Sequence, residues 1–308
     1  MKKLLALIMA LAMVLSLSAT AFAAGVGDTA SLVINVTTTG TEAPDEDLTF
    51  AVQKDGQNAD GFSASYNKQA HQVTVTLPEI TALGAEPGLV GEYNLVQTDL
   101  QTAGMTYGTG YTIKVYLYRD DNGELYRVAR LYHTGEKDMD GIENTYAAGT
   151  LAVSKIVAGN MGDRSAKFTL NVTFNAPAGE TVKSVISYRV GDQDYTIQPN
   201  AMTDGTETVS IVVSHEDTVT FNNIPEGVIY DVVEDASALD GYTPTYNFPD
   251  TSKTISRDDN DTATVTNTKN AAVDTGIMLD SLPYVLLLTV CVVCMVAFFV
   301  KKRSAREF

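Results

Sequence analysis

The chain has 308 residues, of which 38 are acidic and 21 basic, so its formal net charge is −17 at pH 7. Such an acidic chain does not fit nucleic acid or an anionic membrane surface as a partner. The two cysteines, Cys291 and Cys294, lie in an apolar run near the C-terminus, so the rest of the chain contains no disulfide.

The N-terminus has the three parts of a secretory signal peptide. A basic start at Met1-Lys2-Lys3 is followed by an apolar run over 4–17 and by small residues at 21–25. This order predicts a signal peptide over residues 1–24, cleaved after Ala23 or Ala24. A membrane anchor is the alternative, but it needs about 20 apolar residues. We therefore expect an exported mature chain.

The mature sequence reads as strands throughout. Residues with period-two alternation and many β-branched or aromatic side chains occur at 32–36, 72–77, 111–118 and 168–174. Asp121-Asn122-Gly123 separates two tyrosine-rich strands and predicts a hairpin with a type I′ turn. No long amphipathic helix is expected between the two ends. Short strands at this spacing predict an all-β chain of β-sandwiches.

An internal repeat predicts two domains. Residues 31–36 resemble 150–155, residues 93–97 resemble 230–234, and residues 142–145 resemble 265–268. The repeat places a boundary near 146–149, which predicts one domain over 25–147 and another over 148–270.

Three residues of the second domain suggest covalent chemistry. Lys155 lies in its first strand, Glu234 in a late strand and Asn267 in its last strand. If the first and last strands are neighbours, the three side chains meet in the core. A buried amine loses its charge and becomes a nucleophile, and a buried carboxyl can shuttle protons. Attack of the amine on the Asn267 amide would expel ammonia and leave an isopeptide bond, although an exposed lysine, a surface glutamate and a turn asparagine are the alternative.

The C-terminal region, 271–308, resembles a sortase sorting signal. An apolar run over 282–300 is long enough to span a bilayer, and basic residues follow it at 301–303. Val273-Asp274-Thr275-Gly276 precedes it, whereas the family's forms are Leu-Pro-x-Thr-Gly and Val-Pro-Thr-Gly. The resemblance implies that a sortase cysteine attacks the Thr275 carbonyl and releases Gly276 with the membrane segment. Asp274 in place of proline leaves open which sortase acts, and a plain single-pass membrane protein is the alternative.

The chain resembles a known family, the sortase-assembled pilins of Gram-positive bacteria, and in particular the streptococcal major backbone pilins. The resemblance covers both domains and the sorting tail, and it is strongest at residues 151–165, 223–234 and 264–269. It implies two immunoglobulin-like β-sandwiches of the pilin type, each stapled by a Lys-Asn isopeptide bond with a glutamate helper. Lys155, Asn267 and Glu234 fall on those three positions.

The first domain departs from the family's pattern. Asn144 is present, but Val36 occupies the lysine position, and Gln97, or Asp99 in a shifted frame, occupies the glutamate position. Without an amine there is no nucleophile, so we expect no cross-link in the first domain. The family also implies an intermolecular bond from a lysine seven residues before the asparagine, which is Lys137 here, although a solvated turn lysine would look the same.

We expect no metal and no cofactor. The three histidines, His71, His133 and His215, lack ligand spacing, and the acidic clusters at 120–121, 138–140 and 258–261 read as turns. No enzyme motif occurs in the mature chain.

The resulting hypothesis is a secreted, wall-anchored pilus backbone subunit whose partners are a sortase, neighbouring pilin subunits, peptidoglycan and a surface or host ligand. Two alternatives stay open at this point. One is a singly anchored monomeric adhesin, and the other is a wall-displayed enzyme.

Overall fold

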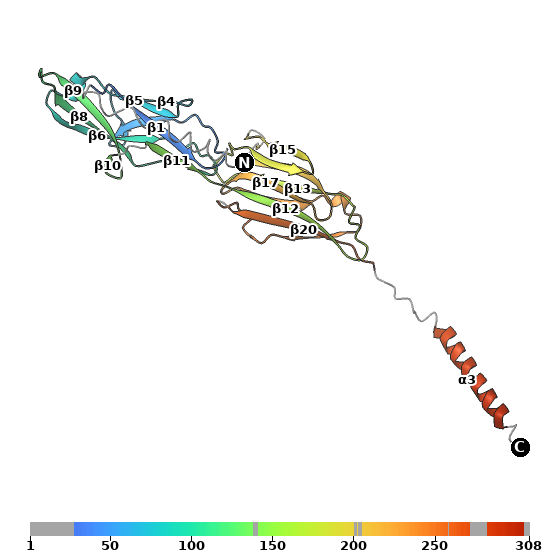
Figure 1. The fold of residues 1–308 in the computed structure, drawn as a ribbon. Coiled ribbons are helices and arrows are strands. Elements are labelled where there is room, and N and C mark those ends of the chain that lie inside the picture. Colours follow the sequence, from blue (N-terminus) through green and yellow to red (C-terminus); the bar gives the residue numbers. More distant parts are fainter. Residues whose placement is uncertain are drawn as a thin grey trace, which may run out of the picture.

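The computed structural model describes residues 28–137, 141–199, 202, 205–257, 259–271 and 282–304. Within these ranges the chain forms two β-sandwiches in a row, followed by one helix (Figure 1). We call residues 28–147 the first unit and residues 148–271 the second unit. The predicted all-β fold with a C-terminal apolar helix is confirmed. The expected signal peptide, 1–24, lies outside the described residues.

The first unit packs a five-stranded sheet against a six-stranded sheet, with a short helix α2 (Ile80–Leu83) at one end. The five-stranded sheet has the order β4 (Ser63–Asn67), β5 (Gln72–Thr76), β1 (Ser31–Thr39), β11 (Ile142–Tyr146) and β7 (Met105–Thr106). The six-stranded sheet has the order β10 (Glu136–Lys137), β9 (Leu125–His133), β8 (Tyr111–Arg119), β6 (Gly88–Gln97), β2 (Phe50–Lys54) and β3 (Gln57–Asn58).

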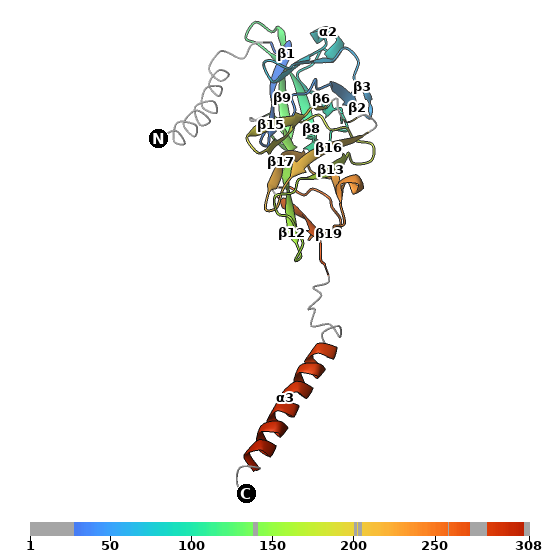
Figure 2. The ribbon, with the colours of Figure 1, turned by 90° about the vertical axis from the view of Figure 1, so that its right-hand side faces the viewer.

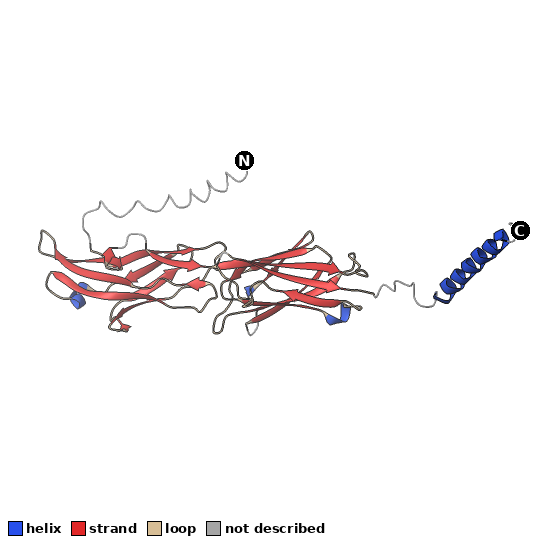
Figure 3. Ribbon diagram, turned by 90° about the horizontal axis from the view of Figure 1, so that it is seen from below, coloured by secondary structure: helices blue, strands red, loops and turns tan. Residues whose placement is uncertain are grey.

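The second unit repeats this plan with a six-stranded and a three-stranded sheet (Figure 3). The larger sheet has the order β15 (Gln193–Ile197), β14 (Ile186–Val190), β17 (Thr218–Pro225), β12 (Ala148–Ala158), β20 (Asn260–Thr268) and β19 (Thr243–Asn247). The smaller sheet has the order β16 (Thr206–Val213), β13 (Phe168–Asn175) and β18 (Ile229–Glu234), and a 3-10 turn, η2 (Ala236–Ala238), follows β18.

The first and last strands of each unit are hydrogen-bonded neighbours. β1 pairs in parallel with β11 in the first unit, and β12 pairs in parallel with β20 in the second. In each unit alternate side chains of these strands point into the core between the sheets, as their alternating burial shows. Inward-facing positions near the ends of the paired strands can therefore meet one another.

The hairpin between β8 and β9 forms as predicted, but its turn type was predicted wrongly. Arg119 pairs with Leu125, so five residues connect the strands. Of the residues in this loop only Gly123 has a positive φ, +81°, whereas a type I′ turn needs a positive φ at both central residues. The Asp120 carboxylate instead accepts hydrogen bonds from the backbone N–H groups of Asn122 and Glu124, and this longer loop replaces the two-residue turn.

The two units meet at a junction with few degrees of freedom. A single residue, Ala147, connects β11 to β12; its N–H donates to the Gly104 carbonyl at 2.8 Å and its carbonyl accepts from the Glu226 N–H at 2.9 Å. The buried Glu46 carboxylate accepts from Thr102 in the first unit and from Lys183 Nζ in the second, at 2.6 and 2.8 Å. Backbone and side-chain bonds thus hold the units end to end.

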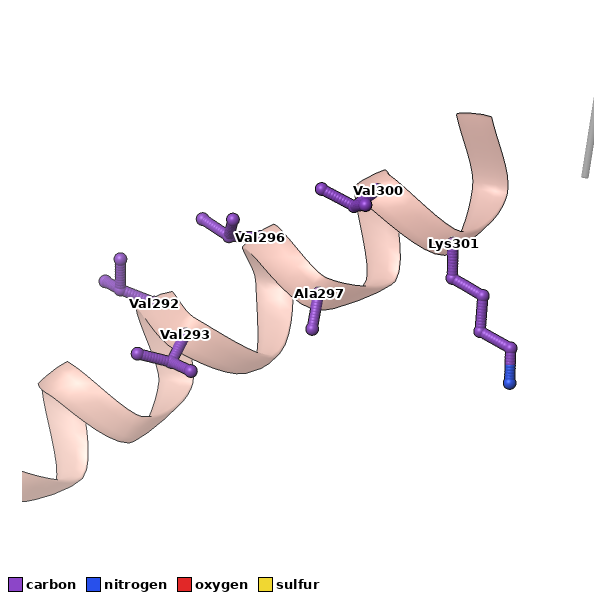
Figure 4. A pocket seen from close by; sticks show the side chains of 6 residues that line it. All are labelled: Val292, Val293, Val296, Ala297, Val300 and Lys301. Carbon is purple, nitrogen blue, oxygen red and sulfur yellow. The ribbon is translucent and has the colours of Figure 1, made fainter. Parts of the chain in front are cut away.

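The last described element is the helix α3 (Leu282–Ser304), which lies beyond the second unit (Figure 2). Among the described residues one stretch, Pro283–Lys302, is long and apolar enough to cross a membrane, with a mean hydropathy of 2.6. Figure 4 shows valine and alanine side chains along one part of this helix and the ammonium of Lys301 extending at its end. None of that stretch is buried by the rest of the chain, which is compatible with a membrane anchor.

Candidate functional site

A lysine lies in the core of the second unit. Lys155 is on β12, where inward-facing and outward-facing residues alternate, and it continues the inward row of Leu151 and Val153. Its side chain is 0% exposed. The strand's alternation therefore places a chargeable group where a hydrophobic side chain would be the ordinary choice.

Glu234 and Asn267 reach the same place from two other strands. Glu234 ends β18 and lies opposite Leu170 of β13 in the three-stranded sheet, so its side chain points toward the facing sheet. Asn267 is on β20 and pairs with Val157, two residues beyond Lys155 on the neighbouring parallel strand. All three side chains are buried.

One carboxylate contacts both of the other groups. Lys155 Nζ donates to Glu234 Oε2 at 2.8 Å, and Asn267 Nδ2 donates to Glu234 Oε1 at 2.6 Å. The amide oxygen Oδ1 of Asn267 is buried and has no hydrogen-bond partner. The three predicted residues therefore form a single buried polar cluster, with the amide carbonyl left unbound.

The burial of the cluster shifts Lys155 toward its neutral form. Burial lowers the pKa of Lys155 from its ordinary value of 10.5, against the opposing effects of the hydrogen bond and the charge of Glu234. A neutral amine beside an amide is a nucleophile beside an electrophile, and the carboxyl that touches both can carry the proton between them. The arrangement has the groups that amide exchange requires.

The sequence did not point to the residues that enclose this cluster. The ring of Phe168 lies 4.5 Å from Lys155 Nζ and packs edge-on against Tyr242 at 5.2 Å. His215 Nδ1 accepts from the Val157 N–H at 3.0 Å, and the Asp217 carbonyl accepts from the Lys155 N–H. The position of Phe168 could have indicated its role, because it lies at the start of β13, two residues before Leu170, which pairs with Glu234.

The first unit has the same positions with different side chains. Asn144 pairs with Thr38, so Val36 stands two residues before that partner, as Lys155 does in the second unit. Gln97 ends β6 and is buried, whereas Asp99 is exposed. Neither amide atom of Gln97 has a partner, and Asn144 Oδ1 accepts from the Gly108 N–H at 2.9 Å. The amide is thus present without an amine to attack it.

The remaining predicted residues lie away from this cluster. Lys137 is exposed on the two-residue edge strand β10, paired with Tyr132 of β9. Thr275 and Gly276 lie outside the described residues. The structure therefore does not bring Lys137 together with the three buried residues of the second unit.

Comparisons with known proteins match most of the chain and, separately, its second half. A family described as a domain of unknown function, DUF7601, matches residues 149–269. The chain is 25% identical over 303 residues to a curated protein named "Pilin" from Streptococcus pyogenes serotype M1, covering 85% of this chain and 86% of that protein.

Solved structures show the same fold. The major pilin from Streptococcus pyogenes aligns with a TM-score of 0.52 at 20% identity, covering 80% of this chain and 99% of that one. The major pilin of another Streptococcus pyogenes serotype aligns with a TM-score of 0.52 at 21% identity, covering 80% of this chain and all 100% of that one. The predicted resemblance to the streptococcal major pilins is confirmed.

Proposed function

We propose that the chain is a wall-anchored pilus subunit of the backbone type, polymerised by a sortase and stabilised by one isopeptide bond. The observation that carries the proposal is the likeness to the curated pilin, which extends over 86% of that protein and not over one domain alone. The proposed division is 1–24, 25–147, 148–270 and 271–308. Its middle boundary is supported by the two hydrophobic cores, because the core of the second unit includes only Ala103 from the first. The relatives named are structural proteins, which supports a role without enzymatic turnover.

The proposed cross-linking step balances without a cofactor. Neutral Lys155 Nζ attacks Cγ of Asn267, and Glu234 takes a proton from the amine and gives one to the leaving amide nitrogen. The new bond joins Nζ to Cγ, the Cγ–Nδ2 bond breaks, and ammonia departs. The hydrogen bonds of 2.8 and 2.6 Å from the two nitrogens to the Glu234 carboxylate support this assignment.

The proposed polymerisation uses two other residues. A sortase would form an acyl-enzyme at Thr275 and release Gly276 with α3, which is compatible with the apolar, unburied character of that helix. Lys137 of a neighbouring subunit would then attack the acyl group, and its exposure on β10 supports access. The last subunit would be passed to peptidoglycan.

An immunoblot of the wall fraction, boiled in detergent, tests the function. We expect a ladder of multiples of the subunit mass, which Lys137→Ala reduces to a single band. Lys54→Ala, which removes another exposed lysine of the first unit, serves as the matched control and keeps the ladder. A single band from the unmutated chain would mean single attachment, as in a monomeric adhesin.

Intact mass tests the cross-link separately. Residues 25–270 should weigh one ammonia less than their sequence, and Lys155→Ala should restore the full mass. A full mass in the unmutated protein contradicts the assignment of Lys155, Glu234 and Asn267. A loss of two ammonia molecules contradicts the expectation that the first unit is not cross-linked.

A further inference from the structure

The end of the second unit holds the chain that leads to the sorting signal. After β20 ends at Thr268, the Lys269 N–H donates to the Ala158 carbonyl at 3.1 Å, and the Lys269 carbonyl accepts from the Met161 N–H at 3.0 Å. These bonds continue the pairing of β12 and β20 past the last strand residue. The chain therefore does not leave the fold where the strand ends.

The side chain of Asn160 extends this pairing by two further residues. Its Nδ2 donates to the Ala271 carbonyl at 3.0 Å, and its Oδ1 accepts from the Ala271 N–H at 2.9 Å. The Asn160 N–H donates to Asn270 Oδ1 at 3.2 Å. An asparagine side chain thus takes the place of a backbone partner and satisfies both polar groups of Ala271. We call Asn160 and residues 269–271 the exit clamp.

Two neighbouring features fit the exit clamp. Gly159 has a φ of +92°, and a Cβ there would lie 2.2 Å from the Lys269 carbonyl oxygen, so a larger residue would push the exit segment away. The Lys269 ammonium donates to the Asp240 carbonyl at 2.7 Å and lies 5.1 Å from the ring centre of Tyr242. Asn160 and Ala271 themselves are exposed, so an enzyme can reach this end of the unit.

The exit clamp lies close to the proposed cleavage site. Three residues, 272–274, separate Ala271 from Thr275. Since a residue spans at most about 3.6 Å, Thr275 stays within roughly 14 Å of the clamped residue. Loss of the Asn160 side chain would remove both bonds to Ala271, while the backbone bonds of Lys269 remain. Ala271 would then move with the segment that follows it, and each residue that an enzyme must order on binding lowers its effective affinity.

We propose that Asn160 is a positioning residue for the sortase step: it holds Ala271 against the second unit and so limits how far Thr275 can lie from the fold. This inference rests on the proposed function. In this arrangement the transpeptidase approaches its substrate over the surface around Asn160.

Pulse–chase of the full chain in its source cells tests the inference, with conversion of the membrane-attached precursor as the readout. Asn160→Ala is expected to slow conversion roughly fivefold, from the added freedom of the exit segment. Asn160→Asp keeps the acceptor for the Ala271 N–H and loses the donor to its carbonyl, so it should fall between. Asn247→Ala, an exposed asparagine of the same unit on β19, should convert at the original rate.

A second variant separates positioning from folding. A Gly-Gly insertion between Ala271 and Ala272 leaves Asn160 untouched and lengthens the arm, so it should also slow conversion. Intact mass shows whether each variant still loses ammonia and is therefore folded around Lys155. Conversion at the original rate in a folded Asn160→Ala variant, or in the insertion variant, would overturn the inference. Continued conversion of Thr275→Ala would instead overturn the proposed function.

Discussion

The two units share an arrangement of strands but differ at two of the three positions that form the buried cluster of the second unit. Both place an asparagine on the last strand, next to a parallel first strand, and both bury a Glu or Gln side chain at the end of another strand, Glu234 on β18 and Gln97 on β6. The second unit has Lys155 where the first has Val36. The asparagine and its surroundings are therefore not sufficient for cross-linking chemistry, because the amine supplies the nucleophile.

In the proposed polymer the two units also carry tension differently. Force that enters at Thr275 reaches Asn267 within eight residues, crosses to Lys155, and follows β12 through Ala147 into β11. It leaves at Lys137, ten residues before Ala147. Most of the first unit lies outside this path, which gives a physical reason why that unit can lack a cross-link.

Single-molecule pulling gives the largest expected contrast. With handles at Ala30→Cys and Thr275→Cys, the first unit should unfold and lengthen the molecule by about 400 Å, at up to 3.6 Å per residue. With handles at Lys137→Cys and Thr275→Cys the same step should be absent. The protein pulled is residues 25–275, which contain no other cysteine, so each pair is attached only at its two ends. A full unfolding step from the Lys137 handle would contradict the tension path.

Breaking the cross-link should remove several kcal/mol from the stability of the second unit. Asn267→Ala leaves the Lys155–Glu234 pair in place but opens a loop of more than one hundred residues. Loop-closure entropy predicts a loss of about 5 kcal/mol, measured by guanidinium unfolding. Asn144→Ala is the matched control in the first unit. This variant should still lose one ammonia relative to its own sequence mass, and the stability of its second unit should be unchanged. Equal unfolding of the Asn267→Ala variant and the parent protein would argue against a cross-link.

Installing the missing groups should transfer the chemistry to the first unit. Val36→Lys with Gln97→Glu places an amine and a carboxyl beside Asn144, so a second ammonia should be lost on folding. The expected gain for the first unit is about 4.7 kcal/mol, from closing a loop of more than one hundred residues between positions 36 and 144. Adding Asn144→Ala to this pair should abolish the second mass loss. A folded double variant of full mass would show that the position of the strands is not sufficient.

The unpaired amide of Gln97 predicts a smaller effect in the same unit. Neither of its side-chain polar atoms has a partner, and a buried unpaired amide costs about 1–3 kcal/mol. Gln97→Leu should therefore stabilise the first unit by roughly 2 kcal/mol in guanidinium unfolding. Glu234→Leu should do the opposite in the second unit, because it removes the partner of both Lys155 and Asn267. Destabilisation by Gln97→Leu would indicate a role for this amide that its contacts do not show.

The sequence predicted the strands and the three buried residues for identifiable reasons. Alternation sets which side chains of β12 and β20 point inward, and the resemblance to the pilin family pointed to Lys155, Glu234 and Asn267 among them. The enclosing groups were not predictable, because Phe168, His215 and Asp217 come from strands and turns whose packing depends on the facing sheet. The exit clamp was missed for the same reason, since Asn160 and Ala271 are 111 positions apart in sequence. The turn after Arg119 was predicted wrongly because the Asp120 side chain competes with the tight turn that Asn-Gly favours.

The smallest expected effect is a pH dependence that reports the state of the amine. In Asn267→Ala, which is not cross-linked, burial lowers the pKa of Lys155 below its ordinary 10.5. Between that lowered pKa and about pH 10, the unfolded chain binds a proton that the folded chain does not. The unfolding free energy should therefore rise with pH in this window, by at most about 1.4 kcal/mol per pH unit.

Buried tyrosines set the upper limit of this pH window, and a variant without the amine serves as the control. Above pH 10 the trend should reverse, because burial raises the pKa of Tyr146 and Tyr230 to about 12 and the folded chain then retains protons that the unfolded chain loses. The reference is the double variant Lys155→Met, Asn267→Ala, which lacks the amine and should show no rise below pH 10. Equal slopes in the two variants would mean that Glu234 holds Lys155 in its charged form, and the nucleophile assigned to the second unit would then need another source of deprotonation.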